Sequence, residues 1–314
     1  MVYLRREAIR MELRVLNYFL AVAREQSISA AAESLHITQP ALSTQMKALE
    51  DELGKQLLIR GRKGSRRVLL TEDGMLLRRR AEEILSLVRK TEDEMSSADN
   101  IAGDVVIGAG ETDVIRCFAR AAKTLQSSCP DVHYHILSGN AEFVLEYLDK
   151  GLIDFGLLFT EVDTARYEYI DVPVRDTWGV LMRRDCPLAA KKAVTPADLR
   201  GERLILSQQS GDAGMIARWI GVDEGEMDVV ATYNLVYNAS LLVDEGLGIA
   251  VTLDKLINTS GSSLCFRPLE PKMEAATRIV WKKYQVFSRA ADAFLKSLKQ
   301  DFENVRESGR FDLL

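Results

Sequence analysis

Residues 27–50, SISAAAESLHITQPALSTQMKALE, decide how the N-terminal part of the chain folds, because they have the pattern of a helix-turn-helix. Ser29 is placed to cap a short alanine-rich helix, whose lack of bulk lets a second helix pack closely against it. His36 falls in the turn, where a left-handed backbone is often needed and histidine tolerates it. Thr38 is placed to cap the second helix, and Pro40 lies in its first turn, where the missing N–H costs nothing. The stretch therefore predicts two helices joined by a tight turn.

The second helix of this motif has one apolar and one polar face. Its apolar residues recur at i, i+4, i+7 and i+11, and they are Leu42, Met46, Leu49 and Leu53. The opposite face carries Pro40, Ser43, Thr44, Lys47 and Asp51. Small polar residues with one cation suit a helix that enters the major groove, and the amide of Gln39 can pair with adenine. For this stretch taken alone, an ordinary amphipathic hairpin with a polar outer face is the alternative interpretation.

Residues 57–71, LLIRGRKGSRRVLLT, predict a wing, in which two short strands are joined by a basic tip that contains glycine. Arg60, Arg62 and Lys63 can neutralise DNA phosphates there. Residues 1–69 carry 12 Lys and Arg against 7 Asp and Glu, a net charge of +5, whereas the whole chain has a net charge of −5. We interpret this basic N-terminal module on an acidic chain as the electrostatic signature of nucleic-acid binding.

Together these pieces resemble the winged helix-turn-helix of LysR-type transcriptional regulators. Residues 13–74 read as an amphipathic helix (LRVLNYFLAVARE), then AAESLHITQPALSTQMKALEDELG, then the wing and LTEDG. Thr44 stands where many members have a longer basic residue, and Leu58 stands where an aromatic residue is usual. The resemblance covers nearly everything after residue 10. It implies binding to a promoter or operator in double-stranded DNA, with RNA polymerase as a further partner. The expected DNA-binding residues are Thr38, Gln39, Pro40, Ser43, Thr44, Lys47, Arg60, Arg62 and Lys63.

Length and composition set outer limits on the fold and the compartment. A chain of 314 residues, 47% hydrophobic and 28% charged, has room for two or three globular domains. No apolar run approaches the roughly 18 residues of a membrane span. Residues 1–10 lack an apolar core or cleavage site, so we expect a cytoplasmic protein. The second Met, at position 11, suggests that these ten residues are either an extension outside the fold or a start-site choice. Four cysteines without CxxC spacing and three histidines predict no metal site and no cofactor.

Residues 71–99 are predicted to form a long linker helix that Thr71 can cap. Positions spaced 4, 3, 4, 3 and 4 apart form a heptad seam, and they are Leu77, Ala81, Ile84, Val88, Thr91 and Met95. We interpret the first four as a dimer seam, because charged residues occupy most other positions. The alternative is packing of the helix on its own domain, which needs a wider apolar stripe. The family resemblance implies a homodimer or a homotetramer.

Residues 100–314 alternate short apolar runs with helical stretches. Strands are predicted at 105–108, 133–137, 155–159, 178–182, 204–207, 229–232, 249–253 and 278–281, and helices at 114–126, 142–150, 239–245 and 289–305. Such alternation predicts α/β units with largely parallel sheets. The resemblance implies an effector-binding domain of two Rossmann-like subdomains with a cleft between them, as in periplasmic binding proteins. Subdomain I would be 104–172 and 276–305, and subdomain II 173–275. The fold class is thus α/β, preceded by the winged helix-turn-helix (11–70) and the linker helix (71–99).

The sequence contains no catalytic motif. GAGET at 108–112 carries two glycines of a dinucleotide fingerprint but lacks the third, and GxSxG, HExxH and Walker lysine motifs are absent. The alternative function is a solute-binding receptor or an α/β enzyme with an accessory helical domain. That alternative predicts an export signal or a catalytic motif, and neither appears. We therefore expect not an enzyme but a sequence-specific DNA-binding transcriptional regulator modulated by a small-molecule effector.

The expected effector site follows from sheet topology. Ligands of open α/β sheets bind at the carboxyl ends of strands, beside helix N-termini. This rule and the resemblance together select Glu111, Thr112, Ser138, Gly139, Asn140, Phe159, Ser207, Gln208, Asn234, Asn238 and Thr252. For any one of them, a helix cap or turn role is an equal alternative.

The chemical class of the effector stays open between a carboxylate and an amino acid. Most of the selected residues offer neutral hydrogen-bonding groups, and helix N-termini favour a carboxylate or phosphate. Glu111 departs from this pattern. Either it caps its own helix, or it binds the ammonium group of an amino acid.

Overall fold

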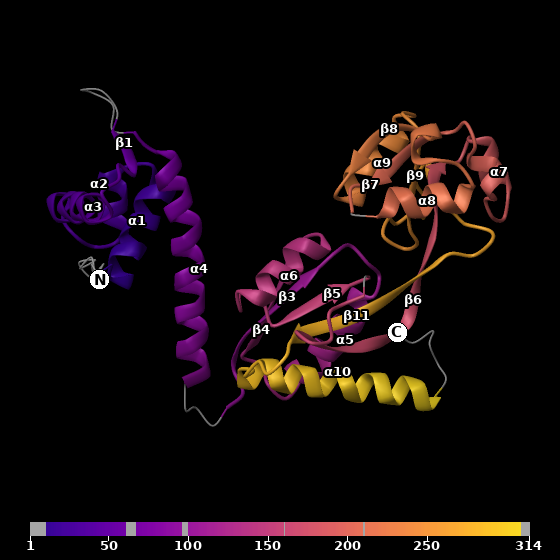
Figure 1. Cartoon of the computed structure of the whole chain (residues 1–314). Coiled ribbons are helices and arrows are strands. Elements are labelled where there is room, and N and C mark those ends of the chain that lie inside the picture. The colour runs from indigo at the N-terminus through magenta and orange to yellow at the C-terminus, as the bar shows by residue number, and fades with distance from the viewer. Residues whose placement is uncertain (1–10, 61–66, 96–99, 160, 210, 309–314) are drawn as a thin grey trace, which may run out of the picture. The chain divides into compact units, whose positions relative to one another are not determined.

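The computed structural model describes residues 11–60, 67–95, 100–159, 161–209 and 211–308 (Figure 1). The chain divides into two compact units, Met1–Ser96 and Ser97–Leu314. The first contains a winged helix-turn-helix and a long helix, and the second is an α/β unit. The fold class expected from the sequence is therefore confirmed.

Four helices and a two-stranded wing make up the described part of the first unit. They are α1 (Leu13–Glu25), α2 (Ile28–Ser34), α3 (Gln39–Leu53), β1 (Leu58–Arg60), β2 (Val68–Leu70) and α4 (Glu72–Met95). The expected cap of α2 is wrong by two residues. Ser27, and not Ser29, caps this helix, since its hydroxyl oxygen accepts a hydrogen bond from the Ala30 amide at 3.3 Å. The helix starts early because Ile28 packs on the core of the unit.

The turn between α2 and α3 has the predicted backbone. His36 adopts a left-handed conformation with φ of 55°. Thr38 occupies the N-cap position and Pro40 lies in the first turn, as expected, but the Thr38 hydroxyl makes no capping hydrogen bond. One of the two amides that a capping side chain can reach is missing there, because proline has no N–H.

Small and apolar side chains bring the three helices of the motif together. Ala31 and Ala32 are buried at the contacts of α2, as their small size predicts. On α3, the predicted core face is confirmed at Leu42, Met46 and Leu49, which are at most 2% exposed, while Leu53 is partly buried. The opposite face of α3 is therefore the face turned to solvent.

The wing pairs β1 with β2 in antiparallel register, with Leu58 opposite Leu70 and Arg60 opposite Val68. Glu50 of α3 fixes the start of β1, because one carboxylate oxygen accepts hydrogen bonds from the Leu57 and Leu58 amides at 2.7 and 2.9 Å. The sequence pattern did not reveal this contact. The tip of the wing, residues 61–66, lies outside the described residues.

The long helix α4 starts against the wing. The Thr71 hydroxyl accepts a hydrogen bond from the Gly74 amide at 2.9 Å, which confirms the predicted cap. Gly74 lies so close to the wing that a Cβ atom there would be 2.2 Å from the Leu57 carbonyl oxygen. The start of α4 can therefore approach the wing only because position 74 has no side chain.

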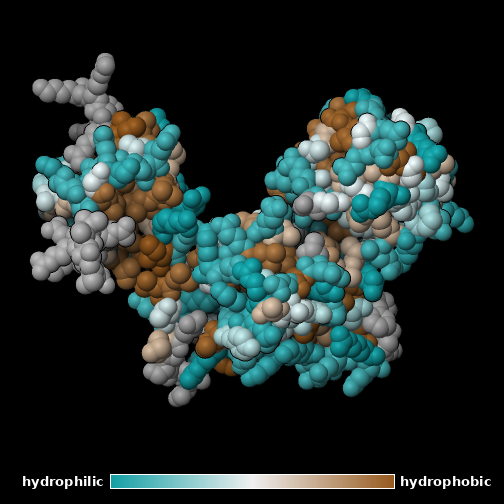
Figure 2. All heavy atoms as spheres, in the orientation of Figure 1, coloured by the Kyte–Doolittle hydropathy of each residue, from teal (hydrophilic) through white to brown (hydrophobic). Residues whose placement is uncertain are grey.

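Part of the heptad stripe of α4 packs inside its own unit. Ala81 is fully buried in a cluster with Leu16 of α1, and Leu77 and Ile84 pack against that cluster. This is the alternative that the sequence left open, and it leaves Ala81 no surface for a partner. Leu76 and Leu87 remain 49% and 39% exposed on α4. Hydrophobic residues are visible on the surface where α1 and α4 lie together (Figure 2).

The second unit alternates strands and helices. Its elements are β3 (Gly103–Ala109), α5 (Ile115–Gln126), β4 (Val132–Ser138), α6 (Ala141–Asp149), β5 (Phe155–Leu158), β6 (Tyr167–Arg183), η1 (Pro187–Ala190), α7 (Pro196–Leu199), β7 (Arg203–Ser207), α8 (Asp212–Ile220), η2 (Glu224–Glu226), β8 (Asp228–Tyr233), α9 (Val236–Asp244), β9 (Ile249–Leu253), β10 (Leu264–Pro268), β11 (Glu274–Lys282) and α10 (Arg289–Ser308). The sheet order is β4-β3-β5-β11-β6-β9-β7-β8, and β10 pairs with β6. Strands β4, β3 and β5 are parallel, as are β8, β7 and β9.

The strand β6 belongs to both halves of this sheet. Its residues 167–177 pair with β11, and its residues 178–183 pair with β9 and β10. The sequence predicted only residues 178–182 of this strand, and it missed β10 and α8. The first half of β6 alternates polar and apolar residues on an antiparallel ladder, so it lacks the continuous apolar run that marks a buried parallel strand.

Each half of the sheet has apolar layers on its faces. In the first half, α5 and α10 supply a cluster around Phe118, Phe155 and Phe294, and the other layer is built around Val144 and Leu148 of α6. The second half has corresponding clusters, with α8 in one and α9 in the other. No described helix combines the length and apolar character needed to cross a membrane.

Candidate functional site

The first candidate surface is the N-terminal half of α3. Thr38, Gln39, Pro40, Thr44 and Lys47 are exposed there, and Ser43 is half-buried between them and the core. The Thr44 hydroxyl donates a hydrogen bond to the Pro40 carbonyl oxygen at 2.9 Å, so its proton is used within the helix. The helix thus presents an amide, a hydroxyl oxygen and an ammonium group along two turns.

The wing supplies the second part of this surface. Arg60 ends β1, but its side chain, together with Arg62 and Lys63, lies outside the described residues. Arg67, which belongs to the basic cluster predicted for the wing, is exposed and donates a hydrogen bond from Nε to the Gln26 side chain at 3.2 Å. Among the positively charged side chains of the wing, the structure therefore describes only that of Arg67, where β2 begins.

The second candidate site is a cavity of about 300 Å³ at the strand ends of the α/β unit. The sequence-selected residues among its walls are Glu111, Gly139, Asn140, Phe159, Ser207, Asn234 and Thr252. They come from the ends of β3, β4, β5, β7, β8 and β9, so the strand-end rule brings together side chains that are far apart in the sequence. Ser138 and Gln208 line an adjoining recess that shares Glu111 and Asn234 with the cavity.

Several of these residues also hold the local structure. Asn140 caps α6 by accepting a hydrogen bond from the Phe143 amide at 2.9 Å. The Ser207 hydroxyl accepts one from the Gln209 amide, and Gln208 donates one to the Thr232 hydroxyl. The sequence offered a capping or turn role as the alternative to lining the cavity. These residues do both.

The structure does not show the first expected role of Glu111, that of capping its own helix, whereas the second, binding an ammonium group, stays a prediction. Its Oε2 atom accepts a hydrogen bond from the Val236 amide, the first residue of α9, rather than capping α5. Glu111 follows β3 in one half of the unit, and α9 belongs to the other half. The carboxylate therefore links the two halves at the N-terminus of a helix, where a negative charge is favourable.

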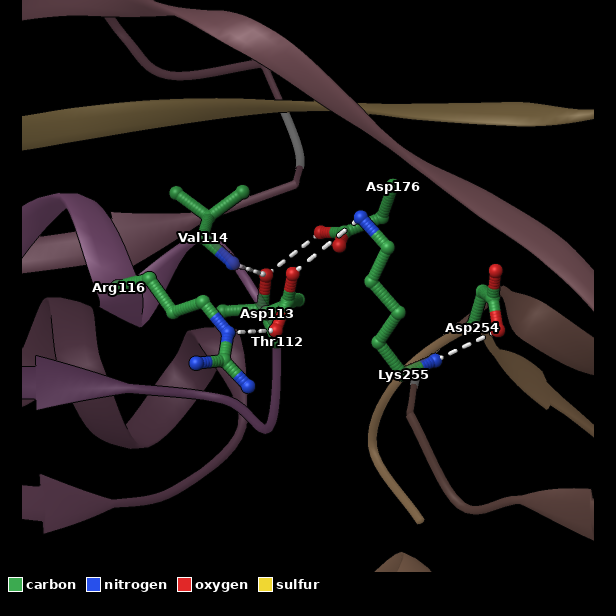
Figure 3. A network of polar contacts seen from close by, with 7 residues as sticks. All are labelled: Thr112, Asp113, Val114, Arg116, Asp176, Asp254 and Lys255. Carbon is green, nitrogen blue, oxygen red and sulfur yellow. Dashed lines mark hydrogen bonds and ion pairs between the residues drawn. The ribbon is translucent and has the colours of Figure 1, made fainter. Parts of the chain in front are cut away.

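Thr112 and Asn238 do not line the cavity. Figure 3 shows Thr112 turned toward Asp176 of β6, to which its hydroxyl donates at 2.5 Å while accepting from the Val114 amide. Burial raises the pKa of Asp176 despite this hydrogen bond. Asn238 is exposed on α9. Thr112 was selected because it follows a strand, but its short side chain is needed at the start of α5.

The network around Thr112 continues to the second half of the unit. Arg116 donates from Nε to Asp113 at 2.6 Å, and the Lys255 ammonium nitrogen lies 3.6 Å from the other Asp113 oxygen (Figure 3). Lys255 follows β9, whereas Asp113 follows β3. These contacts tie the two halves together away from the cavity.

The charges on the cavity wall are all negative. Glu111, Glu142 and Asp212 line it, and no Lys or Arg is among the described lining residues. Burial raises the pKa of Asp212 above its usual range, and a hydrogen bond with Ser207 acts in the opposite direction. Burial, reinforced by the negative charges of Asp212 and Glu111, raises the pKa of Tyr233 to about 12.

Other cavity residues were missed by the strand-end rule. Trp178 lies within β6, and Tyr233 is the last residue of β8, one position beyond the predicted strand 229–232. Asp212 lies in the first turn of α8, a helix that the sequence pattern did not reveal. Asp212 could not be selected, because the helix that begins with it was not predicted. Gly110 also lines the cavity, and a Cβ atom there would be 3.3 Å from the Gln209 side-chain nitrogen. Among the described residues, no group of three His, Cys, Asp or Glu side chains could hold a metal ion.

Comparison with known proteins identifies the same two parts of the chain. The family model described as LysR substrate binding domain matches residues 98–303. The family model described as bacterial regulatory helix-turn-helix protein, lysR family, matches residues 13–75.

Individual relatives agree with these matches. The Hca operon transcriptional activator HcaR of Escherichia coli K12 is 27% identical over 280 residues, which cover 87% of this chain and 92% of that protein. The DNA-binding transcriptional dual regulator OxyR of the same strain is 32% identical over 198 residues, 62% of this chain and 63% of that protein. The crystal structure of CbnR, a LysR family transcriptional regulator, has a TM-score of 0.73 at 20% identity and covers 93% of this chain and 99% of that one. CbnR complexed with its target DNA has a TM-score of 0.72 at 21% identity, with 92% and 99% covered.

Proposed function

The chain belongs to the LysR family of transcriptional regulators, and from this premise we propose that α3 and the wing bind operator DNA while the strand-end cavity binds a small-molecule effector. The family consists of regulators and not of enzymes. The main support for DNA binding is the two-sided character of α3. The outer face of its first half is polar and exposed to solvent, and its inner face is apolar and buried. A relative, CbnR, is known in complex with its target DNA, which supports this assignment.

The proposal divides the work of DNA binding between base and backbone contacts. Gln39, Ser43, Thr44 and Lys47 lie on the part of α3 that enters the major groove in helix-turn-helix proteins. The side-chain amide of Gln39 can pair with adenine through two hydrogen bonds. Arg60, Arg62 and Lys63 contact phosphates, which position the protein without reading sequence.

We expect Gln39→Ala and Lys47→Ala to weaken DNA binding in different ways. Loss of Gln39 should cost roughly 1–3 kcal/mol on the cognate site and much less on unrelated DNA. Loss of Lys47 should weaken both and reduce the salt dependence by about one counterion. Gel retardation and salt titrations on the DNA upstream of the protein's own gene would measure both effects.

Lys55→Ala is the matched control. Lys55 is also an exposed lysine, but it follows the C-terminal end of α3 and pairs with Asp73 at 3.3 Å. It is roughly 24 Å along the helix axis from Gln39 at 1.5 Å per residue. If Gln39→Ala weakened all DNA sequences alike, the readout role of α3 would be wrong.

We propose that α4 also mediates a homodimer, which presents two α3 helices to two half-sites. Because Ala81 is buried against α1, the dimer seam proposed from the sequence shifts to the exposed Leu76 and Leu87 together with Ile84 and Val88. Tetramers through the α/β units stay a prediction from the family resemblance. The limits of the two subdomains, 104–172 with 276–305 and 173–275, stay a proposal as well.

Leu87→Asp should dissociate this dimer. It places a charge on the exposed apolar side of α4 without disturbing the buried cluster around Ala81 and Leu16. Light scattering should show a smaller mass, and affinity for a two-half-site operator should fall at least tenfold. Arg89→Asp is the control, because position 89 lies on a different side of the helix, roughly 200° away at 100° per residue. A Leu87→Asp protein of unchanged mass would exclude this seam.

A further inference from the structure

We propose that the strand-end cavity takes a small molecule with a protonated amino group on an apolar body. The inference rests on the proposed function, in that it assumes the cavity to be the effector site. It decides between the ligand classes that the sequence left open. The shared chemistry is the ammonium group, which simple amines and amino acids both carry.

The charge of the cavity wall is the first argument. Three carboxylates, those of Glu111, Glu142 and Asp212, line the cavity, and no Lys or Arg does so among the described residues. An anionic ligand would bring a further negative charge into a partly enclosed space, where charges interact more strongly than in water. A carboxylate without a cationic group is therefore disfavoured, even though helix N-termini are nearby.

The three carboxylates differ in how far they are already satisfied. Glu111 uses Oε2 for the Val236 amide, and no hydrogen bond to its Oε1 occurs among the described residues. Glu142 is exposed at the start of α6. Asp212 is half-buried with Ser207 as its hydrogen-bond partner, and its raised pKa reflects the cost of burying its charge. A ligand cation beside Asp212 would offset that cost, so Asp212 is the principal anchor.

The apolar walls define the rest of the ligand. Phe159, Trp178 and Leu157 line the cavity together with Leu158, Leu253 and Leu256. Aromatic faces attract cations as well as apolar groups, and this attraction strengthens when the cation is shielded from water. A cavity of about 300 Å³ is at the small end of ligand sites. The effector is therefore a small amine with an aliphatic or aromatic body.

A matched set of probes tests this class directly. The probes are 2-phenylethylamine, 2-phenylethanol and 3-phenylpropanoate, which share a ring and chain but differ in charge, together with phenylalanine. Thermal unfolding of the full-length protein is followed by Trp fluorescence with each probe at 10 mM and neutral pH. Binding to the folded state stabilises it by RT ln(1 + [L]/Kd), so at one probe concentration a tighter ligand raises Tm more. We expect the amine to raise Tm most, the alcohol less and the carboxylate least.

Two carboxylate-to-amide variants assign the effect to the cavity. Asp212→Asn should weaken amine binding at least tenfold and should reduce the difference between amine and carboxylate. Asp131→Asn, which removes one exposed charge outside the cavity, is its control and should change nothing. Glu111→Gln and Glu303→Gln form a second matched pair, with Glu303 exposed on α10. Phenylalanine that stabilises as well as phenylethylamine would identify the effector as an amino acid.

The outcomes separate this inference from the proposed function. Gly110→Leu fills the cavity beside Gln209 and Phe159 and should abolish binding of every probe. If the carboxylate stabilised as much as the amine, and Gly110→Leu removed the effect, the amine class would be overturned while the cavity stayed the effector site. If probes stabilised the Gly110→Leu protein equally, the cavity itself would fail as the site. A panel in which no amine raises Tm would also overturn the amine class.

Discussion

Replacing Gly74 with alanine is expected to unfold the winged helix-turn-helix at much lower denaturant concentration and to abolish measurable DNA binding. The added Cβ atom would lie 2.2 Å from the Leu57 carbonyl oxygen, a backbone atom that cannot turn aside. That oxygen also accepts the Thr71 amide hydrogen bond at 3.0 Å, so moving it disrupts the start of α4. Overpacking costs about 1–3 kcal/mol and occasionally more, which is a large fraction of the stability of a small unit.

The two units can be followed separately in this measurement. All three tryptophans, Trp178, Trp219 and Trp281, lie in Ser97–Leu314, so Trp fluorescence reports on the α/β unit alone. Far-UV circular dichroism reports on both units. Gly74→Ala should lower the denaturant midpoint of the first unit, which only dichroism detects. The midpoint of the α/β unit, which fluorescence detects, should stay unchanged. Gly225→Ala, whose added Cβ would meet no atom within 4 Å, is the control. A Gly74→Ala protein with wild-type unfolding and DNA affinity would contradict the close approach.

Replacing Phe294 with alanine is expected to destabilise the α/β unit by about 3–5 kcal/mol. Phe294 of α10 is fully buried, and its ring lies 5.7 Å from that of Phe118, 5.2 Å from Tyr134 and 5.8 Å from Phe155. It therefore joins α10 to α5, β4 and β5. Truncation loses apolar burial, leaves a cavity and removes three aromatic contacts.

Urea unfolding followed by Trp fluorescence would measure this loss as a lower midpoint with an unchanged slope. Phe294→Leu keeps most of the side-chain volume and should lose less than half as much, which separates packing from a general intolerance of substitution. Fluorescence midpoints that were equal for the wild type and Phe294→Ala would show that α10 is not part of the core.

The helix-turn-helix could be predicted because its signals are local. The spacing of Leu42, Met46 and Leu49, the left-handed turn at His36 and the proline at position 40 each follow from one or two turns of backbone. The cap of α2 was misplaced because serine occurs at both 27 and 29, and the packing of Ile28 decides between them. The contact between Glu50 and the start of β1 is tertiary and has no sequence signal.

In the α/β unit, the strand-end rule found polar residues of the cavity but not its electrostatic character. That character depends on Asp212, which lies in a helix whose sequence, DAGMIARWI, has a weak helical signal because of Gly214. The cavity wall also includes Trp178 and Tyr233, which the sequence does not distinguish from other strand residues, because only the sheet topology places them at the cavity. Glu111 was recognised as exceptional, but its partner Val236 is 125 residues away.

The continuity of β6 restricts how the two halves of the α/β unit can move. The segment 175–177 of β6 pairs with 274–276 of β11, so the halves are joined by a ribbon of two hydrogen-bonded strands. Such a ribbon resists stretching and sliding but yields to torsion and bending. We therefore expect the cavity to open by a rotation of one half of the unit relative to the other about the axis of this ribbon. Atoms near Asp176 would move little, and atoms far from the axis would move most. Glu111 precedes Thr112, which is bonded to Asp176, and its own hydrogen bond with the Val236 amide joins the two halves close to the ribbon. We therefore expect a change of charge beside Glu111 to alter the angle between the halves through this contact.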